Sequence, residues 1–119
     1  MIHYWIVGKT WAGEDQAQRF YSLGKWEMGY EEAEVPKYDK KIAQIKAGDR
    51  LAVKHMNGKG QKDITIVAIG IVKGIEERVV YVDWIVKDLN RKVPSRGCFG
   101  TLHGPYTYKN AWTRQVFCL

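Results

Sequence analysis

The sequence predicts a mostly β domain of the α+β class, a curved antiparallel β-barrel with two or three short helices. Strand-like runs occupy most of the second half, at residues 50–55, 63–75 and 78–88, where β-branched and aromatic side chains recur between turn-forming segments. Helical spacing of apolar residues is confined to two short segments in the first half. Gly70 interrupts the longest apolar run, which favours a bulge or bend. A barrel is expected because closure removes exposed strand edges.

The first half begins with a strand and a short helix. The letters IHYWIV, at residues 2–7, combine aromatic and β-branched side chains and are followed by Gly8, which predicts the opening strand. The segment GEDQAQRFYSLG, at residues 13–24, has acidic residues early and apolar residues at helical spacing. This pattern predicts a helix that Gly24 terminates.

A second helix precedes the strands. The segment 36–49 starts with Pro36 and carries apolar residues on one face and lysines elsewhere, which is typical of a short amphipathic helix. The turn-like letters NGKG (57–60) and EE (76–77) separate the three strand-like runs. The second half is therefore expected to form a meander of antiparallel strands.

The end of the chain is harder to assign. Residues 89–111 are rich in glycine, proline and basic residues, which predicts a long ordered loop or short irregular strands. The letters WTRQVF, at residues 112–117, predict a final strand. Asp49 stands between a glycine and a strand, where an aspartate commonly accepts hydrogen bonds from the backbone of its own turn.

Length and charge point to one domain with a polyanionic partner. A chain of 119 residues is expected to form a single domain, 1–119, with a core of its own. The net charge of +6 and the pI of about 9.3 favour nucleic acid, and a basic surface without such a partner is the alternative. Five tryptophans and seven tyrosines exceed what this core needs, and rings beside basic residues stack on bases.

The cysteines and histidines show no metal-ligand spacing. Cys98 and Cys118 form no CxxC pair, and the three histidines are far apart in the sequence. We therefore expect no metal and no cofactor. Signal peptide, apolar run of membrane length and lipidation motif are all lacking in the sequence. The expectation is a cytoplasmic monomer with reduced thiols and no membrane partner.

Five short segments follow one another between residues 2 and 90 of the sequence. They are YWIVGKTW, LGKWEMGY, IKAGDRLAVK, IVAIGIV and VDWIVKDL. In this order the chain resembles the PUA-like superfamily, and within it the EVE domains and the related YTH modified-base readers. The resemblance implies a PUA-like barrel that reads a methylated or hydroxymethylated cytosine, or a methylated adenine, with DNA favoured. It also implies a nuclease or other effector protein as a partner, because such EVE domains accompany modification-dependent restriction systems.

The resemblance places most of the base-binding residues in the segments YWIVGKTW and LGKWEMGY. It implies that Trp26 forms one wall of an aromatic cage around a flipped base, with Lys9 and Thr10 facing the nucleotide. A loop position between Gly24 and Gly29 suits a ring with a free face. We therefore expect Trp26 to be exposed along one ring face and to line the main pocket. The alternative is that Trp26 plugs the open end of the barrel.

Three further residues belong to the expected base site. Trp11 is a candidate second wall of the cage, or else the cover of a core edge. Glu27 follows Trp26 directly. Trp84 shares a strand face with valines, so that a core position is favoured over base contact. Trp112 is a candidate only if the final strand lies beside the first. The expected phosphate-binding residues are Lys25, Lys54, His55, Arg91, Arg96 and Lys109, with Lys92 and Arg114 in addition.

Two other functions stay open. The first is an RNA-binding PUA-like domain, since the 2′-hydroxyl contacts that separate RNA from DNA are not visible in a sequence. The second is a hydrolase of modified nucleosides, because the resemblance to ASCH-type relatives implies a lysine, a threonine and a glutamate, here Lys9, Thr10 and Glu27. No paired carboxylates and no Ser/His/Asp set support an enzyme further. Binding without catalysis is therefore the expected activity.

Overall fold

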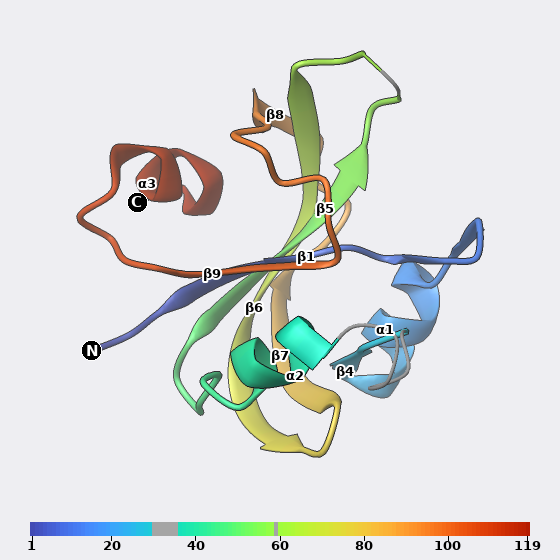
Figure 1. Ribbon diagram of the computed structural model, residues 1–119, viewed down its shortest axis with the longest axis vertical. Helices are drawn as coiled ribbons and strands as arrows, with labels where there is room; N and C mark the ends of the chain where they lie inside the picture. The colour runs from blue at the N-terminus through green and yellow to red at the C-terminus, as the bar shows by residue number, and fades with distance from the viewer. Residues whose placement is uncertain (30–35, 59) are drawn as a thin grey trace.

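The computed structural model describes residues 1–29, 36–58 and 60–119. One curled sheet, shaped like half a barrel, forms the centre of the molecule (Figure 1). Its strands are β1 (Tyr4–Val7), β4 (Lys25–Glu27), β5 (Arg50–Met56), β6 (Asp63–Glu76), β7 (Val79–Val86), β8 (Arg91–Pro94) and β9 (Leu102–Tyr106). A small ribbon of β2 (Thr10–Trp11) and β3 (Glu14–Asp15) and the helices α1 (Ala17–Leu23), α2 (Pro36–Ile42) and α3 (Ala111–Phe117) complete the described elements. The mostly β, α+β prediction is confirmed.

The strand order is β4-β7-β6-β5-β1-β9, with β8 paired to the other end of β6. Strands β5, β6 and β7 form the predicted antiparallel meander. Strand β1 departs from the prediction, because it runs parallel to β5 while pairing antiparallel with β9. The reason is the long crossover between β1 and β5, which carries α1, β4 and α2 and returns the chain in the same direction.

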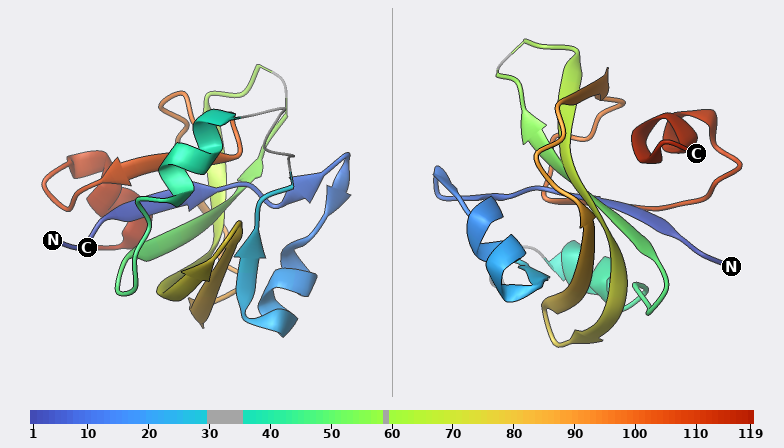
Figure 2. Two further views of the ribbon diagram at one scale, coloured as in Figure 1. Left: turned by 60° about the horizontal axis from the view of Figure 1, so that its bottom comes forward. Right: turned by 180° about the vertical axis from the view of Figure 1, so that it is seen from behind.

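The curl of the sheet comes from irregularities in strand pairing. Register shifts occur between β6 and β7 at Ile69/Gly70 and at Val72/Gly74, and between β5 and β6 at Val53/Lys54. Gly70 is required there, because a Cβ at this position would lie 2.9 Å from the carbonyl oxygen of Asp83. The predicted bend at Gly70 is confirmed. Instead of closing, the described strands run in an open path from β4 to β9, which the views in Figure 2 show as a half-barrel.

Two apolar clusters form the core. The first contains Trp5, Phe20 and Trp26, and the second contains Tyr4 and Trp112. Strand β1 contributes alternate residues to both clusters, so all four of its side chains are buried. Such burial on both faces is typical of a strand inside a covered sheet, and it explains why the aromatic letters of this strand show no polar alternation.

The helices follow the predicted positions with shorter limits. Gly24 ends α1 in the left-handed conformation at φ 64°, as predicted. Helix α1 starts only at Ala17, because β3 uses Glu14 and Asp15. Helix α2 starts at Pro36 as predicted and ends at Ile42. In the described part of the chain, none of the helices is long and apolar enough to cross a membrane.

The predicted final strand at residues 112–117 is wrong, because this segment is helix α3. The Asn110 side chain caps the helix by accepting a hydrogen bond from the Thr113 N–H at 3.1 Å. Trp112, Val116 and Phe117 are buried at helical spacing in the second cluster. Strand propensity of the individual residues is therefore overridden by a cap and a helical apolar face.

Asp49 has the structural role that its position predicts. Its carboxylate is fully buried and accepts hydrogen bonds from the Lys46 N–H of its own turn at 3.1 Å and from the His3 N–H at 3.0 Å. Trp5 Nε1 and Lys46 Nζ also donate to it, at 3.0 and 2.9 Å. Burial would raise the pKa of Asp49, but these hydrogen bonds outweigh it and hold the pKa below its usual value.

Candidate functional site

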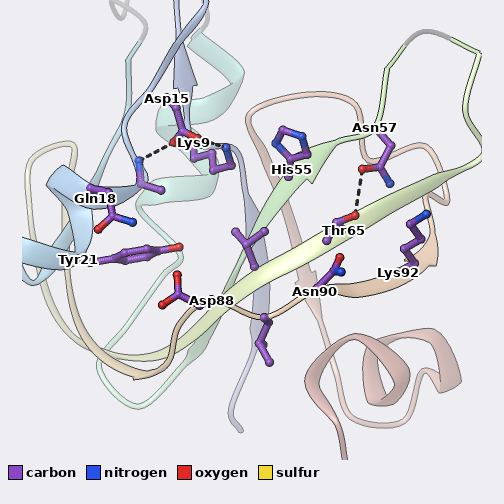
Figure 3. A pocket seen from close by; sticks show the side chains of 13 residues that line it. Lys9, Asp15, Gln18, Tyr21, His55, Asn57, Thr65, Asp88, Asn90 and Lys92 are labelled. Atoms are coloured by element: carbon purple, nitrogen blue, oxygen red, sulfur yellow. Dashed lines mark hydrogen bonds and ion pairs between the residues drawn. The ribbon is translucent and has the colours of Figure 1, made fainter.

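An open groove of about 580 Å³ lies between α1 and the strands β5, β6 and β8 (Figure 3). Its volume falls in the range of roughly 300–1,000 Å³ that is typical of ligand pockets. Segments that are far apart in the sequence contribute to it. The lining residues are Lys9, Asp15, Ala17, Gln18, Tyr21, His55, Asn57, Thr65, Val67, Asp88, Leu89, Asn90 and Lys92.

The segment after β7 forms one wall of the groove. Its N–H at Leu89 donates to the Val67 carbonyl oxygen of β6 at 2.9 Å, which holds the segment against the sheet. Asp88 adopts a left-handed conformation at φ 59°, which an aspartate tolerates better than most residues. This turn places Asp88 and Asn90 in the groove (Figure 3). Asp88 lies on the same side as Tyr21 of α1, and Asn90 lies beside Thr65.

A buried lysine and an aspartate meet at the upper end of the groove. Lys9 Nζ forms an ion pair with the Asp15 carboxylate, which also accepts a hydrogen bond from the Ala17 N–H at 2.8 Å. Burial would raise the pKa of Asp15, but the hydrogen bonds from Lys9 and Ala17 and the charges of Lys9 and His55 hold it below its usual value. Asp15 therefore stays ionised and neutralises Lys9.

Tyr21 supplies a hydroxyl that remains protonated. Burial, followed by the negative charges of Asp88 and Asp15, raises the pKa of Tyr21 to about 12. Its ring meets Trp84 edge-on, with 5.3 Å between the ring centroids, and the hydroxyl points into the groove toward Asp88 in Figure 3. At neutral pH this hydroxyl can therefore donate a hydrogen bond to a ligand.

Several polar groups in the groove have no partner within the described ranges. Asn57 is satisfied, since its amide donates to Asp63 at 2.9 Å and accepts from the Thr65 hydroxyl at 3.0 Å. In contrast, the side-chain amides of Gln18 and Asn90 and the Asp88 carboxylate form no hydrogen bond or ion pair with another described residue. The same holds for the amino group of Lys92 and the ring of His55. The groove thus presents free acceptors and donors beside the ammonium group of Lys92.

The expectation that Trp26 exposes a ring face is wrong. Its relative exposure is 0 %, its Nε1 donates to the Gly8 carbonyl oxygen at 2.9 Å, and it pairs with Val80 where β4 joins β7. The flanking glycines serve other purposes. Gly24 caps α1, and a Cβ at Gly29 would lie 2.5 Å from the Trp11 ring. In this conformation Trp26 is part of the first cluster, and a base cannot stack on it.

The other predicted cage residues also pack against the core. Trp11 is half-buried, meets Phe20 edge-on at 5.8 Å between centroids, and carries the Arg19 guanidinium 5.2 Å from its ring centroid. Trp84 is half-buried, as the favoured core prediction requires, and donates from Nε1 to the Phe20 carbonyl oxygen at 3.0 Å. Trp112 lies on α3 and donates to the Pro94 carbonyl oxygen at 2.8 Å. These three tryptophans lie outside the lining of the groove.

The residues of the expected hydrolase set are bound to different partners. Lys9 pairs with Asp15 and lines the groove. Glu27 instead forms ion pairs with Arg19, at 3.1 Å, and with Lys25. Thr10 is exposed and contributes to a different, smaller pocket. Lys9 and Glu27 therefore form ion pairs with different residues and not with each other.

The predicted phosphate-binding residues differ in their surroundings. His55 lines the groove, as does Lys92. Arg96 and Lys109 are exposed, whereas Arg91 donates to the Gln115 carbonyl oxygen at 2.8 Å and Arg114 to that of Tyr108 at 2.6 Å. Lys54 is buried, and Lys25 forms an ion pair with Glu27.

Sequence reasoning missed most of the groove. Tyr21, Asp88 and Asn90 were not expected to act together, although Asp88 and Asn90 follow directly on a predicted strand, where functional polar side chains often lie. Tyr21 lies four residues after Ala17 on α1 and is half-buried against the first cluster, so its position in the sequence indicates packing rather than a site. Among the described residues, His, Cys, Asp and Glu side chains form no group of three or more that could hold a metal ion.

A scan against protein-family models gave no match for this chain, and a search of curated proteins found no similar sequence. The groove's own geometry is therefore the basis for a function.

Proposed function

We propose that this protein is a nucleic-acid-binding module that takes a single base, in particular a modified base in DNA, into the groove between α1 and β6. One observation carries the proposal. The groove combines a carboxylate and two amides without protein partners with a tyrosine hydroxyl that stays protonated. The side chains of Gln18, Asp88 and Asn90 are exposed to solvent in the groove, so that they are accessible to a ligand, and a few convergent polar groups in a concave site favour a ligand with a matching edge.

A nucleobase is the ligand whose edge suits these groups. An aspartate accepts from the exocyclic amine of cytosine, and asparagine or glutamine can bond adenine through its N6 and N7 atoms. Asp88, Asn90 and Gln18 are the residues that would do so here. Ala17, Val67 and Leu89 line the same groove with apolar surface. A methyl group buried there would add on the order of 0.8 kcal/mol, the contribution of about one CH₂ group.

Two hydrogen-bond donors of the groove, of which Lys92 is charged, suit the phosphates on either side of such a base. Lys92 and His55 lie on the wall opposite Tyr21 in Figure 3. Contacts of this kind position a nucleic acid without reading its sequence, whereas the polar groups inside select the base. Extrusion of a base from a duplex costs a few kcal/mol, and the cost is smallest for a single strand. Single-stranded or locally unpaired DNA is therefore the substrate that should bind most tightly.

A binding panel tests the proposal. The probes are DNA and RNA oligonucleotides, single- and double-stranded, with unmodified, methylated or hydroxymethylated cytosine or methylated adenine at one position. Asp88→Asn should lower the affinity for the preferred probe by about tenfold, because a charge-assisted hydrogen bond is lost. Asparagine tolerates the left-handed backbone of this position, so the fold should persist.

Asp83→Asn is the matched control, because Asp83 is exposed on β7 outside the groove and its substitution changes the net charge equally. It should leave the affinity unchanged. Equal affinity of wild type and Asp88→Asn for every probe would place the base elsewhere. A higher affinity for the RNA probes than for the DNA probes would make the protein an RNA-binding domain. Product analysis of the same incubations by mass spectrometry should find every nucleotide unaltered, since Lys9 and Glu27 are held by separate partners.

A further inference from the structure

A second, smaller pocket of about 150 Å³ adjoins the groove at Lys9, which lines both. It is formed by the turn after β1 (residues 8–10), by Lys54 and Met56 of β5, and by the loop at residues 99–101. The two walls are joined by a hydrogen bond from the Gly8 N–H to the Thr101 carbonyl oxygen at 2.8 Å. This volume is smaller than the roughly 300 Å³ at which pockets for whole drug-sized molecules begin.

The pocket contains a buried ammonium group without a counter-charge. Lys54 is only 2 % exposed, and its Nζ donates to the Cys98 carbonyl oxygen at 2.7 Å and approaches the Met56 sulfur at 3.4 Å. No carboxylate of the described residues forms an ion pair with Lys54. A buried charge without an opposite charge is costly, and burial lowers the pKa of Lys54 to about 8.

The surroundings of Lys54 add positive charge. Lys41 Nζ donates to the Leu102 carbonyl oxygen at 3.4 Å and likewise forms no ion pair within the described part of the chain. Burial, with the charges of Lys54, Lys41 and Lys37, lowers the pKa of His103 to about 4. The nearby Cys98 thiol supplies no negative charge either, because burial raises its pKa. Within the described residues, this region therefore has positive charge without a neighbouring anion to neutralise it.

We propose that the Lys54 pocket binds a phosphodiester group of nucleic acid, next to the base that the groove accepts. The proposal rests on the proposed function, because it assigns the adjacent pocket to the same nucleotide chain. The phosphate supplies the counter-charge of Lys54, and the hydroxyls of Thr10 and Thr101 at the same pocket are further donors. Phe99, 56 % exposed at this pocket, offers a ring for a neighbouring base, which favours a polynucleotide over free phosphate.

The test compares Lys54→Met with Lys73→Met. Both substitutions remove one positive charge, but Lys73 is exposed on β6 and lies outside the pockets described above. Lys54→Met should lower the affinity for the best single-stranded probe by about tenfold and reduce the salt slope of log K by about 0.7, the value expected for one phosphate contact on a single strand. Lys73→Met should change neither quantity. Thermal unfolding of both variants is measured in parallel, and we expect Lys54→Met to be as stable as wild type, because an apolar isostere replaces an uncompensated charge.

A second measurement uses the wild-type protein and does not depend on the variant. Dimethyl phosphate and inorganic phosphate are titrated separately while the Nζ resonance of Lys54 is followed by NMR. Dimethyl phosphate should shift this resonance and raise the pKa of Lys54 toward its ordinary value. A shift with inorganic phosphate alone, or an unchanged affinity and salt slope in Lys54→Met, would overturn the proposal. If Asp88→Asn weakens binding while Lys54→Met does not, only the phosphate site fails. If oligonucleotides do not bind at all, the function proposed for the groove fails as well.

Discussion

At the scale of single residues, Trp26 shows how a ring that looks exposed in the sequence becomes part of the core. Strand β4 is only three residues long, and its central residue faces the first cluster because Lys25 and Glu27 on either side point elsewhere and form an ion pair. The Gly8 carbonyl oxygen satisfies the indole N–H. An indole buried in this way contributes through both packing and one hydrogen bond.

Trp26→Ala should therefore lower the free energy of unfolding by about 3–5 kcal/mol, the usual cost of removing a buried tryptophan. Chemical denaturation followed by circular dichroism measures the change. Tyr108→Ala is a suitable control, because this ring is 52 % exposed and its loss should cost less than about 0.5 kcal/mol. A Trp26→Ala protein with wild-type stability would mean that the ring is not part of the core in solution.

His103 makes the stability of the protein depend on pH. Its ring Nε2 accepts a hydrogen bond from the Gly100 N–H at 2.9 Å, which requires the neutral form. Because the pKa is about 4 in the folded protein and 6.5 in an ordinary histidine, the unfolded chain binds the proton first as the pH falls. Stability should therefore decrease between pH 6.5 and 4, by at most about 3 kcal/mol.

Urea denaturation across this pH range measures the effect, and His103→Gln is the comparison, because glutamine keeps an acceptor and does not titrate. The difference in stability between the two proteins should shrink as the pH falls. A difference that is constant from pH 6.5 to 4 would show that His103 titrates normally in the folded state.

The role of a residue could be predicted where its partners are close to it in the sequence. Asp49 was predicted correctly because an aspartate in a glycine turn finds its partners within three residues, as the Lys46 N–H shows. Trp26 was not, because its burial depends on pairing with β7, more than fifty residues away in the sequence. The burial of Lys54 could not be predicted for the same reason, since its hydrogen-bond partner Cys98 comes from a distant loop.

At the scale of elements, local patterns were reliable where the turn and the apolar period agree. Strands β5, β6 and β7 were predicted because each is bounded by turn residues and is strand-like throughout. The parallel pairing of β1 with β5 has no local signature, because it is set by the crossover between them. Segment 112–117 contains residues that favour strands, and the decisive cap, Asn110, lies just outside it.

The cap of α3 leads to a prediction at this scale. Asn110→Ala should lower the free energy of unfolding by about 1 kcal/mol, because the Thr113 N–H loses its acceptor. Asn110→Ser, which keeps a capping oxygen, should retain most of the stability. Thermal unfolding of the three proteins in one buffer provides the comparison. If alanine and serine are equivalent at this position, the side-chain cap does not stabilise the helix.

At the scale of the whole molecule, the groove results from the curl of the sheet. Residues from the turn after β1, from α1, from β5 and β6, and from the segment after β7 line the groove together because the pairing of β1, β5, β6 and β7 in one sheet brings these segments close (Figure 3). No contiguous motif of the sequence contains more than a few of them. The fold class is therefore readable from periodicity, whereas the site requires the long-range pairing of the strands.

The net charge of +6 belongs to the whole molecule and favours a polyanionic partner, whose binding should weaken as the salt concentration rises. Each phosphate that the protein neutralises releases condensed counterions, so log K should fall linearly with log salt concentration. With Lys92 at the groove and Lys54 in the adjoining pocket as the phosphate contacts, the slope on a single strand should be about −1.4, at roughly −0.7 per contact. Between about 50 and 200 mM salt this corresponds to a roughly sevenfold loss of affinity.

Fluorescence anisotropy with a labelled single-stranded probe measures this slope. Lys92→Met should reduce it by about 0.7, the share of one contact. An uncharged peptide nucleic acid of the same base sequence is the control, because it offers the bases without phosphates and its binding should not respond to salt. A salt-independent affinity for the DNA probe would exclude phosphate contacts and leave base recognition in the groove as the whole of the interaction.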